Sequence, residues 1–405
     1  MFPQLLNGIR ITDLTWAGAG PYSTKVFSDL GAEVLKVESG VRPDPVRNGR
    51  PYKDGVQGLN RSGYFASRNN GKLSVSINLK HPASRDIVLA LAAKSDVITN
   101  NFAPGAMERL RLSYEDVRRV KEDIIYLGMP MYGEQGPLAR MLGVGMTIAA
   151  VSGMTSLTGY HDGPPLGPGT HFPDHAVNPY HATFAVLAAL RHKRLTGRGM
   201  KIDLSQAEST LNAVGAAFTE WSTTGKEPAR VGNRSATCAP HNIFRCKGED
   251  EWCAITVLTD KQWQSLCATI DRADLGGEAR YASAPGRLAD VDQLEEAVAA
   301  WTAGRDAVEV MTSLQNVGVP AGIVESARTL MDEDPQLRER RYWQDVDHAE
   351  MGTTRFSSPP YLLDGERVDL RPPPLLGEHT DEVLSRVLQY SGTDIQKLRD
   401  QGVLS

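Results

Sequence analysis

The first half of the chain alternates short apolar runs with longer amphipathic segments. Five runs rich in β-branched residues predict strands, at residues 9–14, 33–38, 73–79, 96–99 and 124–128. Segments with helical spacing lie between them, at about 21–30, 82–93 and 112–120. Because strands that alternate with helices build parallel sheets, this pattern predicts α/β architecture up to about residue 205.

A longer helix is predicted from Asn178 to about Arg194. Asn178 is a typical N-cap, and Pro179 suits the first helical position, where a missing N–H is harmless. Gly197 follows the segment, as is common after the C-terminus of a helix.

The pattern changes near residue 225. Two short runs, 244–246 and 252–257, flank Gly248 and predict a hairpin. Helical patterns follow at 261–270, 293–303 and 307–317, and a proline-rich stretch, predicted to be extended, precedes a last helix at 381–388. We therefore expect the first part of a large domain at 1–224, a smaller α+β domain at 225–328, and a closing part at 329–405.

Composition narrows the classes of function. The net charge of −5 comes without a block of basic residues, so neither nucleic acid nor an anionic membrane is an expected partner. No apolar run approaches the roughly 20 residues that span a bilayer, and the first residues lack the apolar core of a signal peptide. We expect a cytoplasmic protein whose four cysteines are reduced and buried.

A glycine-rich turn follows the first predicted strand. Gly18 and Gly20, with Glu38 at the end of the second strand, are typical of dinucleotide binding and of a nicotinamide-dependent oxidoreductase. Ser23 stands where the third glycine belongs, however, and Pro21 removes a backbone N–H that would face a pyrophosphate. The dinucleotide interpretation therefore remains an alternative that the turn only partly supports.

Six blocks of sequence, in order, resemble the family III coenzyme A transferases. The first is GIRITDLTWAGAGPYSTKVFSDLGAEVLKVES and the last is PPPLLGEHTDEVL. Between them lie SVSINLKHPASRDIVLALAAKSDVITNNFAPGAMERL, YGEQGP, a series of S-G, T-G and D-G-P-P steps, and LAALRHKRLTGRGMKIDLSQAE. The resemblance implies a Rossmann-like large domain built from both chain ends, a smaller domain from the middle, and an interlocked dimer.

The same resemblance implies a catalytic role for Asp174. In the family, an aspartate ahead of the long helix attacks an acyl-CoA thioester and carries CoA as an aspartyl thioester. Asp174 is the only carboxylate between Asp162 and Asp203. The stretch from Asp174 to Thr196 is one residue longer than is usual, so we expect a reshaped helix start near Asn178.

The family motif also implies residues that contact CoA, which is a substrate here rather than a permanently bound cofactor. They are Gly18, Ala19, Asn78, Leu79, Lys80, Asn101, Phe102, Ala103 and Arg109. Ser39 stands where relatives can carry an arginine, for which Arg42, Arg47 or Arg50 could compensate, although solvated surface roles are the simpler expectation for these three.

Residues around the acyl group are expected to be Gly143, Val144, Gly145, His171 and His175. The two glycines leave room for a large acyl group, and the two histidines suit a carboxylate. Together they favour a large acid, aromatic or dicarboxylic, such as benzylsuccinate with succinyl-CoA as donor. Related racemases use a histidine at the position of Val144, and valine cannot transfer a proton, which disfavours racemisation. The family uses no metal, although His171, Asp174, His175 and His181 cluster in sequence. The partner is a second identical chain or a similar subunit.

Overall fold

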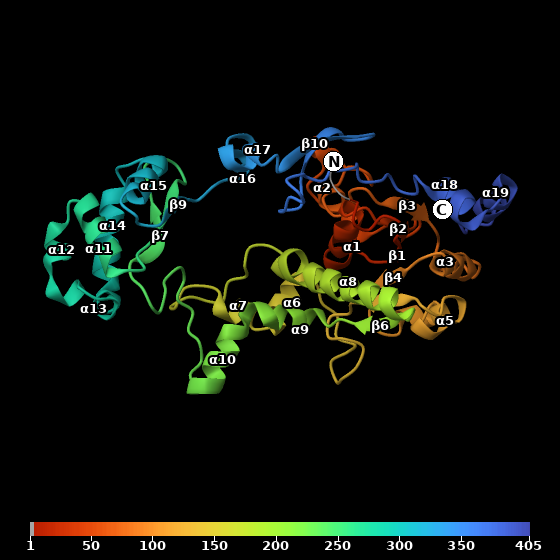
Figure 1. The fold of residues 1–405 in the computed structure, drawn as a ribbon, viewed down its shortest axis with the longest axis horizontal. Coiled ribbons are helices and arrows are strands. Elements are labelled where there is room, and N and C mark those ends of the chain that lie inside the picture. The colour runs from red at the N-terminus through yellow and green to blue at the C-terminus, as the bar shows by residue number, and fades with distance from the viewer. Residues whose placement is uncertain (1–3) are drawn as a thin grey trace. The chain divides into compact units, whose positions relative to one another are not determined.

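The computed structural model describes residues 4–405 and has a mixed α/β fold, as predicted (Figure 1). The chain packs as two compact units. The larger unit contains the residues up to Leu157, Leu166–Pro228 and Gln336–Ser405, and the smaller unit contains Thr158–Pro165 and Ala229–Pro335. The boundaries expected from the sequence, 224/225 and 328/329, lie a few residues before those between the units.

A six-stranded parallel sheet organises the larger unit. Its strands are β1 (Arg10–Asp13), β2 (Glu33–Glu38), β3 (Leu73–Ser76), β4 (Val97–Asn100), β5 (Ile125–Gly128) and β6 (Met200–Asp203). The strand order is β3-β2-β1-β4-β5-β6, and every pair is parallel. This is the order of doubly wound nucleotide-binding folds, and it confirms the predicted parallel sheet.

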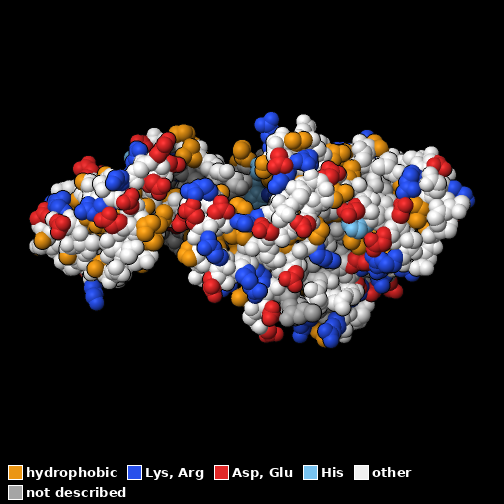
Figure 2. Space-filling view, turned by 90° about the horizontal axis from the view of Figure 1, so that it is seen from above, with side chains coloured by type: hydrophobic (Ala, Val, Ile, Leu, Met, Phe, Trp, Pro, Cys, Tyr) orange, Lys and Arg blue, Asp and Glu red, His pale blue; other side chains and the backbone are white. Residues whose placement is uncertain are grey.

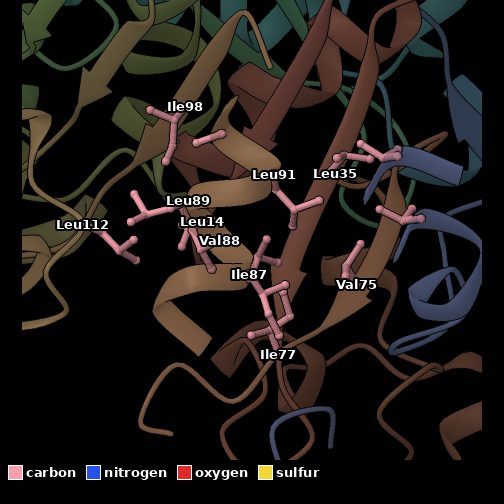
Figure 3. Close-up of a cluster of buried hydrophobic side chains, with 14 of the residues drawn as sticks. Leu14, Leu35, Val75, Ile77, Ile87, Val88, Leu89, Leu91, Ile98 and Leu112 are labelled. Atoms are coloured by element: carbon pink, nitrogen blue, oxygen red, sulfur yellow. The ribbon is translucent and has the colours of Figure 1, made fainter. Parts of the chain in front are cut away.

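Helices cover both faces of this sheet because both faces are apolar. Adjacent strand residues point to opposite faces, so Val34 packs with α1 (Ala19–Asp29) and α8 (Asn178–Thr196), whereas Leu35 packs on the other side. That second cluster includes α3 (Ser84–Ala93) and α5 (Tyr114–Val120). Figure 3 shows its side chains converging from strands and helix, with Ile87 and Leu91 of α3 beside Val75.

The end of the chain returns to the edge of the sheet. Helix α18 (Thr380–Leu388) packs against β3, and the backbone N–H of His379 donates to the carbonyl of Ser74 (Figure 1). Two features differ from the prediction. A hairpin of β10 (Trp343–His348) and β11 (Gly352–Ser357) precedes the proline-rich stretch, and α19 (Gly392–Asp400) follows α18.

The smaller unit has its own apolar core. Strands β7 (His241–Arg245), β8 (Trp252–Thr256) and β9 (Ala321–Ile323) form an antiparallel sheet. Helices α11 (Asp260–Thr269), α14 (Val291–Thr302) and α15 (Ala307–Asn316) pack on it. The predicted hairpin and three helices are confirmed, and all four cysteines are buried and free of disulfides.

The remaining helices are short. In the larger unit they are α2 (Gly63–Ala66), α4 (Ala106–Arg109), α6 (Gly145–Val151), α7 (Met154–Leu157), α9 (Gln206–Leu211) and α10 (Gly215–Thr224). The smaller unit contains α12 (Ala273–Gly277), α13 (Ala284–Ala289) and α16 (Ala327–Asp332), and α17 (Pro335–Glu339) begins at the last residue of that unit and continues into the larger one.

The surface carries charges of both signs. Acidic and basic side chains are mixed over the face seen in Figure 2, without a continuous basic block. Across residues 4–405, the structure contains no helix with both the length and the apolar character needed to cross a membrane.

Candidate active site

Loops that follow four neighbouring strands enclose the main cavity of the larger unit, of about 980 Å³. They lie after β1, β2, β3 and β4, at the carboxyl edge of the sheet. The strand order progresses outward from β1 to β3 on one side and from β4 to β6 on the other, and doubly wound sheets bind their ligands at this switch point between β1 and β4.

Most residues singled out in the sequence meet at this cavity. All of those expected to contact CoA line it: Gly18, Ala19, Asn78, Leu79, Lys80, Asn101, Phe102, Ala103 and Arg109. Asp174, His171, Gly143 and Val144 line it as well. Gly145 and His175 are not among the lining residues and lie behind its wall.

The first wall of the cavity is the loop between β1 and α1. Ala17 has a left-handed backbone, with φ of 65°, and its N–H donates to Asp44 over 3.0 Å. The side chain of Asn101 brackets Trp16, because it accepts from the Trp16 N–H at 2.8 Å and donates to the Trp16 carbonyl at 2.7 Å. An unfavourable backbone geometry is therefore held in place by partly buried hydrogen bonds.

Two fully buried ion pairs lie beneath this loop. Lys36 pairs with Asp44 at 3.2 Å and also donates to the carbonyl of Thr15 at 3.0 Å. Lys72 pairs with Asp13 at 3.1 Å. Burial raises the pKa of Asp13, but the charges of Lys72 and Lys36 outweigh it and lower the pKa to about 2. The sequence did not indicate this network.

Asp174 lies in a π-helical turn, Pro173–Val177, that runs directly into α8. A π-helical turn accommodates one more residue than an α-helical turn, and this turn lies within the stretch that was expected to be one residue longer than usual. The expected N-cap role of Asn178 is wrong. Asn178 itself already has helical backbone angles, φ of −56° and ψ of −43°, and its side chain contacts Ser209 and donates to Gln206 at 3.3 Å.

The carboxyl group of Asp174 is packed between two glycines. A Cβ on Gly18 would lie 2.6 Å from Oδ2 of Asp174, and a Cβ on Gly145 would lie 2.8 Å from the same oxygen. Burial raises the pKa of Asp174, while the charges of His171 and Arg68 and a hydrogen bond from the Gly145 backbone oppose the rise. The carboxyl is thus confined and partly dehydrated.

Glu38 lines the cavity but is not available to bind a ribose. Its two oxygens accept from Arg47 at 2.7 and 2.8 Å, and Ser74 donates to it at 2.6 Å. Burial raises the pKa of Glu38, and its bonds to Arg47 reverse the shift and lower it. Glu38 therefore cannot serve as the ribose-binding acid that the dinucleotide interpretation requires. The expectation of a solvated Arg47 is also wrong, since its side chain is fully buried.

Four basic residues line the cavity without being part of these buried pairs. They are Arg42, Arg50, Lys80 and Arg109. The Arg42 guanidinium lies 5.1 Å from the ring centroid of Trp16. Cations beside an aromatic wall suit a ligand that carries phosphates and a base. Arg42 and Arg50 were considered in the sequence, whereas Trp16 was missed, although it follows β1 directly.

His175 belongs to a separate group behind the cavity. Its ring packs edge-on to Tyr22 and Tyr64, and both ring nitrogens lie 3.0 Å from Nη2 of Arg68. Burial, together with the charges of Arg68 and His171, lowers the pKa of His175 to about 4. The ring is therefore neutral at physiological pH and accepts a hydrogen bond. Sequence reasoning missed Arg68, which no local pattern marks.

A second cavity, of about 400 Å³, shares Gly143 and Val144 with the first. Its wall is mostly apolar and includes Met131, Met141 and Leu142. No charged side chain of the described chain lines it. Residues 4–405 also contain no group of three or more His, Cys, Asp or Glu side chains placed to hold a metal ion.

Fold and cavity together define an α/β protein that holds its ligand at the carboxyl edge of a parallel sheet, beside a confined carboxylate. The model of CoA-transferase family III matches residues 6–380. The chain belongs to this family and is a family III CoA-transferase.

Relatives with named activities match nearly the whole chain. The succinyl-CoA:glutarate CoA-transferase of Mus musculus is 30% identical over 98% of this chain and 90% of its own length. The succinyl-CoA:mesaconate CoA-transferase of Haloarcula marismortui is 32% identical over 96% of this chain and 98% of its own length. The probable CoA-transferase Rv1866 of Mycobacterium tuberculosis is 30% identical over 98% of this chain, which spans only 50% of that protein.

A solved structure shares the fold. The CAIB/BAIF family protein from Brucella suis superimposes with a TM-score of 0.86 at 25% identity, covering 96% of this chain and 100% of that chain.

Proposed function

We propose that this enzyme transfers CoA from an acyl-CoA donor, with succinyl-CoA as the first candidate, to a carboxylic acid through Asp174. One observation carries the proposal. Only two carboxylates line the main cavity among the described residues, and Glu38 is paired with Arg47. Asp174 is thus the lining carboxylate that is left without an ion-pair partner, so its oxygens are free to attack a bound thioester.

The proposed reaction begins when the carboxylate of Asp174 attacks the donor thioester. The C–S bond breaks, CoA leaves as a thiolate, and a mixed anhydride forms. The thiolate then attacks the aspartyl carbonyl and expels the donor acid as a carboxylate, which leaves an aspartyl-CoA thioester. The acceptor carboxylate repeats these steps in reverse, so the thioester bond is conserved throughout.

The walls around Asp174 support this chemistry. Burial limits the access of water, which would otherwise hydrolyse the anhydride and the thioester. A raised pKa makes the carboxylate a stronger nucleophile once it is ionised. The cations at the cavity, including Lys80 and Arg109, suit the phosphates of CoA.

We further propose an acceptor that is aromatic or dicarboxylic, such as benzylsuccinate. The apolar second cavity adjoins Gly143 and Val144, so a ring or chain can extend from the reacting carbonyl into it. His171 at the main cavity is suited to a second carboxylate. The dicarboxylic substrates named for the mouse and Haloarcula relatives are consistent with this class.

The test is intact-protein mass spectrometry after incubation with succinyl-CoA. We expect a CoA adduct at Asp174 in the wild-type enzyme, sensitive to hydroxylamine, and no adduct in Asp174→Ala. Benzylsuccinate, glutarate and mesaconate are then compared for discharge of the adduct. Exchange of an α-proton into deuterated water without any adduct would refute the transferase mechanism and favour a racemase.

We also propose that two chains associate, either identical or as similar subunits. Helix α10 has no buried residue, and its Trp221 is 51% exposed. Phe184 on α8 is 75% exposed. Apolar side chains of this size are typical of interfaces between subunits. Light scattering of the purified chain tests the proposal, and a strict monomer that retains activity would refute it.

A further inference from the structure

Arg68 is a buried cation without a carboxylate partner. The residue is only 6% exposed, and its Nε has no hydrogen-bond partner. Its Nη1 donates to the Tyr64 carbonyl at 2.8 Å and to Ser67 at 3.0 Å, and its Nη2 contacts the neutral ring of His175. The ion pairs of the described residues do not include it. Such an arrangement is costly, because burial of a charge is normally offset by an opposite charge.

The field of Arg68 reaches Asp174. Its guanidinium lies 3.5 Å from the ring centroid of Tyr64, and Tyr64 in turn lines the main cavity. The charge of Arg68 opposes the rise in the pKa of Asp174 caused by burial. Among the largest influences on the pKa of Arg68, two come from carboxylates, Asp174 and Asp44, and Asp44 is paired with Lys36.

The reaction changes the charge that faces Arg68. In the free enzyme, the negative charge of Asp174 partly offsets the positive charge of Arg68, although the two side chains form no ion pair. In the aspartyl-CoA thioester, Asp174 is neutral and Arg68 is left uncompensated. This is the stage at which the acceptor, itself a carboxylate, must approach the same carbonyl.

We propose that Arg68 is the positioning residue for the acceptor, because from behind Tyr64 it attracts a carboxylate to the acylated Asp174. The inference rests on the proposed function. The acceptor carboxylate attacks the aspartyl carbonyl, the C–S bond breaks, and CoA thiolate leaves. One negative charge then remains in the site, on the thiolate, and it attacks the acceptor carbonyl to release the acceptor as its CoA thioester and Asp174 as a carboxylate.

The test compares a charged and a neutral nucleophile on the same intermediate. The aspartyl-CoA form is prepared with succinyl-CoA and mixed with either succinate or hydroxylamine. Both release CoA from Asp174, but hydroxylamine is neutral and gains nothing from a positive potential. The ratio of the two rates therefore reports the charge effect, and it does not depend on the fraction of folded protein.

In Arg68→Met, we expect the succinate-to-hydroxylamine ratio to fall about 30-fold. A fall of this order is what the loss of one nearby charge produces at an effective dielectric constant of about 20. Arg68→Lys, which keeps the charge, should remain within about threefold of the wild type. Lys25→Met is the matched control, since Lys25 is also a buried cation but is ion-paired with Asp29, and it should leave the ratio unchanged.

The outcomes separate the two proposals. If Arg68→Met forms the adduct and its ratio equals that of the wild type, Arg68 has only a structural role and the inference is wrong. The inference is equally wrong if the succinate-to-hydroxylamine ratio falls as far in Arg68→Lys as in Arg68→Met. If the wild-type enzyme forms no adduct at Asp174, both the inference and the proposed function are refuted.

Discussion

Adding one methyl group at Gly18 should disable Asp174 without unfolding the protein. The Cβ of an alanine at this position would lie 2.6 Å from Oδ2, 2.9 Å from Cγ and 2.9 Å from Cβ of Asp174. The overlap involves the root of the aspartate side chain as well as its tip, so rotation of the carboxylate cannot relieve it. The backbone of Gly18, with φ of −97° and ψ of −85°, does not have a positive φ, so an alanine there is not strained by left-handed geometry.

The size of the effect follows from these distances. Carbon atoms in contact prefer a separation of about 3.5 Å or more, so the side chain must move by about 0.6 Å. Displacement of a reacting group by about 1 Å costs roughly 100-fold in rate, and we expect a loss of about 10- to 100-fold in the acylation of Asp174. Overpacking of this kind costs about 1–3 kcal/mol in the free energy of unfolding.

The assay is the rate at which the CoA adduct appears after mixing Gly18→Ala with succinyl-CoA, followed by mass spectrometry. Urea unfolding of the same preparation measures stability. Gly63→Ala is the control, because its Cβ would lie 3.5 Å from Pro51, an ordinary contact in the same unit. If Gly18→Ala acylates as fast as the wild type, Asp174 is not confined by the glycine and the reasoning from this contact is wrong.

Three further predictions follow from the buried charges and the exposed surface. Because burial raises the pKa of Asp174 above its usual 3.8 and only the carboxylate attacks, the acylation rate should fall on acidification through a pKa above that value, measured as adduct formation against pH. Asp13→Asn leaves the fully buried Lys72 unpaired and should lower the free energy of unfolding by about 3–5 kcal/mol. The exposed Glu382→Gln should lower it by less than about 1 kcal/mol, both measured by urea unfolding. Trp221→Glu should convert the proposed dimer to a monomer in light scattering, and an unchanged mass would remove α10 from the interface.

Five of the six strands of the sheet were predictable because they are buried on both faces, whereas the partly exposed β6 was not predicted as a strand. Such strands are usually rich in apolar residues. The run 33–38 coincides with β2, and its charged residues Lys36 and Glu38 are fully buried in ion pairs. The run 73–79 overestimates β3, which ends at Ser76. Beyond it, Ile77 and Leu79 pack on the apolar core and also line the cavity, so their apolar character does not require a strand. Helix α19 was missed because Ile395 is its only buried residue, too little to mark a helical face.

The position of Asp174 was inferred from order along the chain, but its surroundings were not. Arg68 lies 107 positions before His175, and only the packing of α2 and its following turn beside the π-helical turn brings Arg68 close to Asp174. No periodic pattern marks Arg68, because its environment is composed of Tyr22, Tyr64 and His175 from three separate segments. Long-range contacts of this kind have no local signal in one sequence.

The glycine-rich turn shows how the same motif serves a different need. In a dinucleotide fold, its glycines admit a pyrophosphate; here Gly18 admits the side chain of Asp174. Ser23 and Pro21, which interrupt the dinucleotide-binding fingerprint, form hydrogen bonds within the protein instead of facing a ligand. Ser23 donates to the carbonyl of Gly20 at 2.6 Å, and the carbonyl of Pro21 accepts from the buried Lys72 at 2.8 Å. Pro21 thus ties the start of α1 to the buried ion pair of Lys72. The carboxylate of Asp174 occupies the space beside Gly18 where a dinucleotide fold would hold a phosphate.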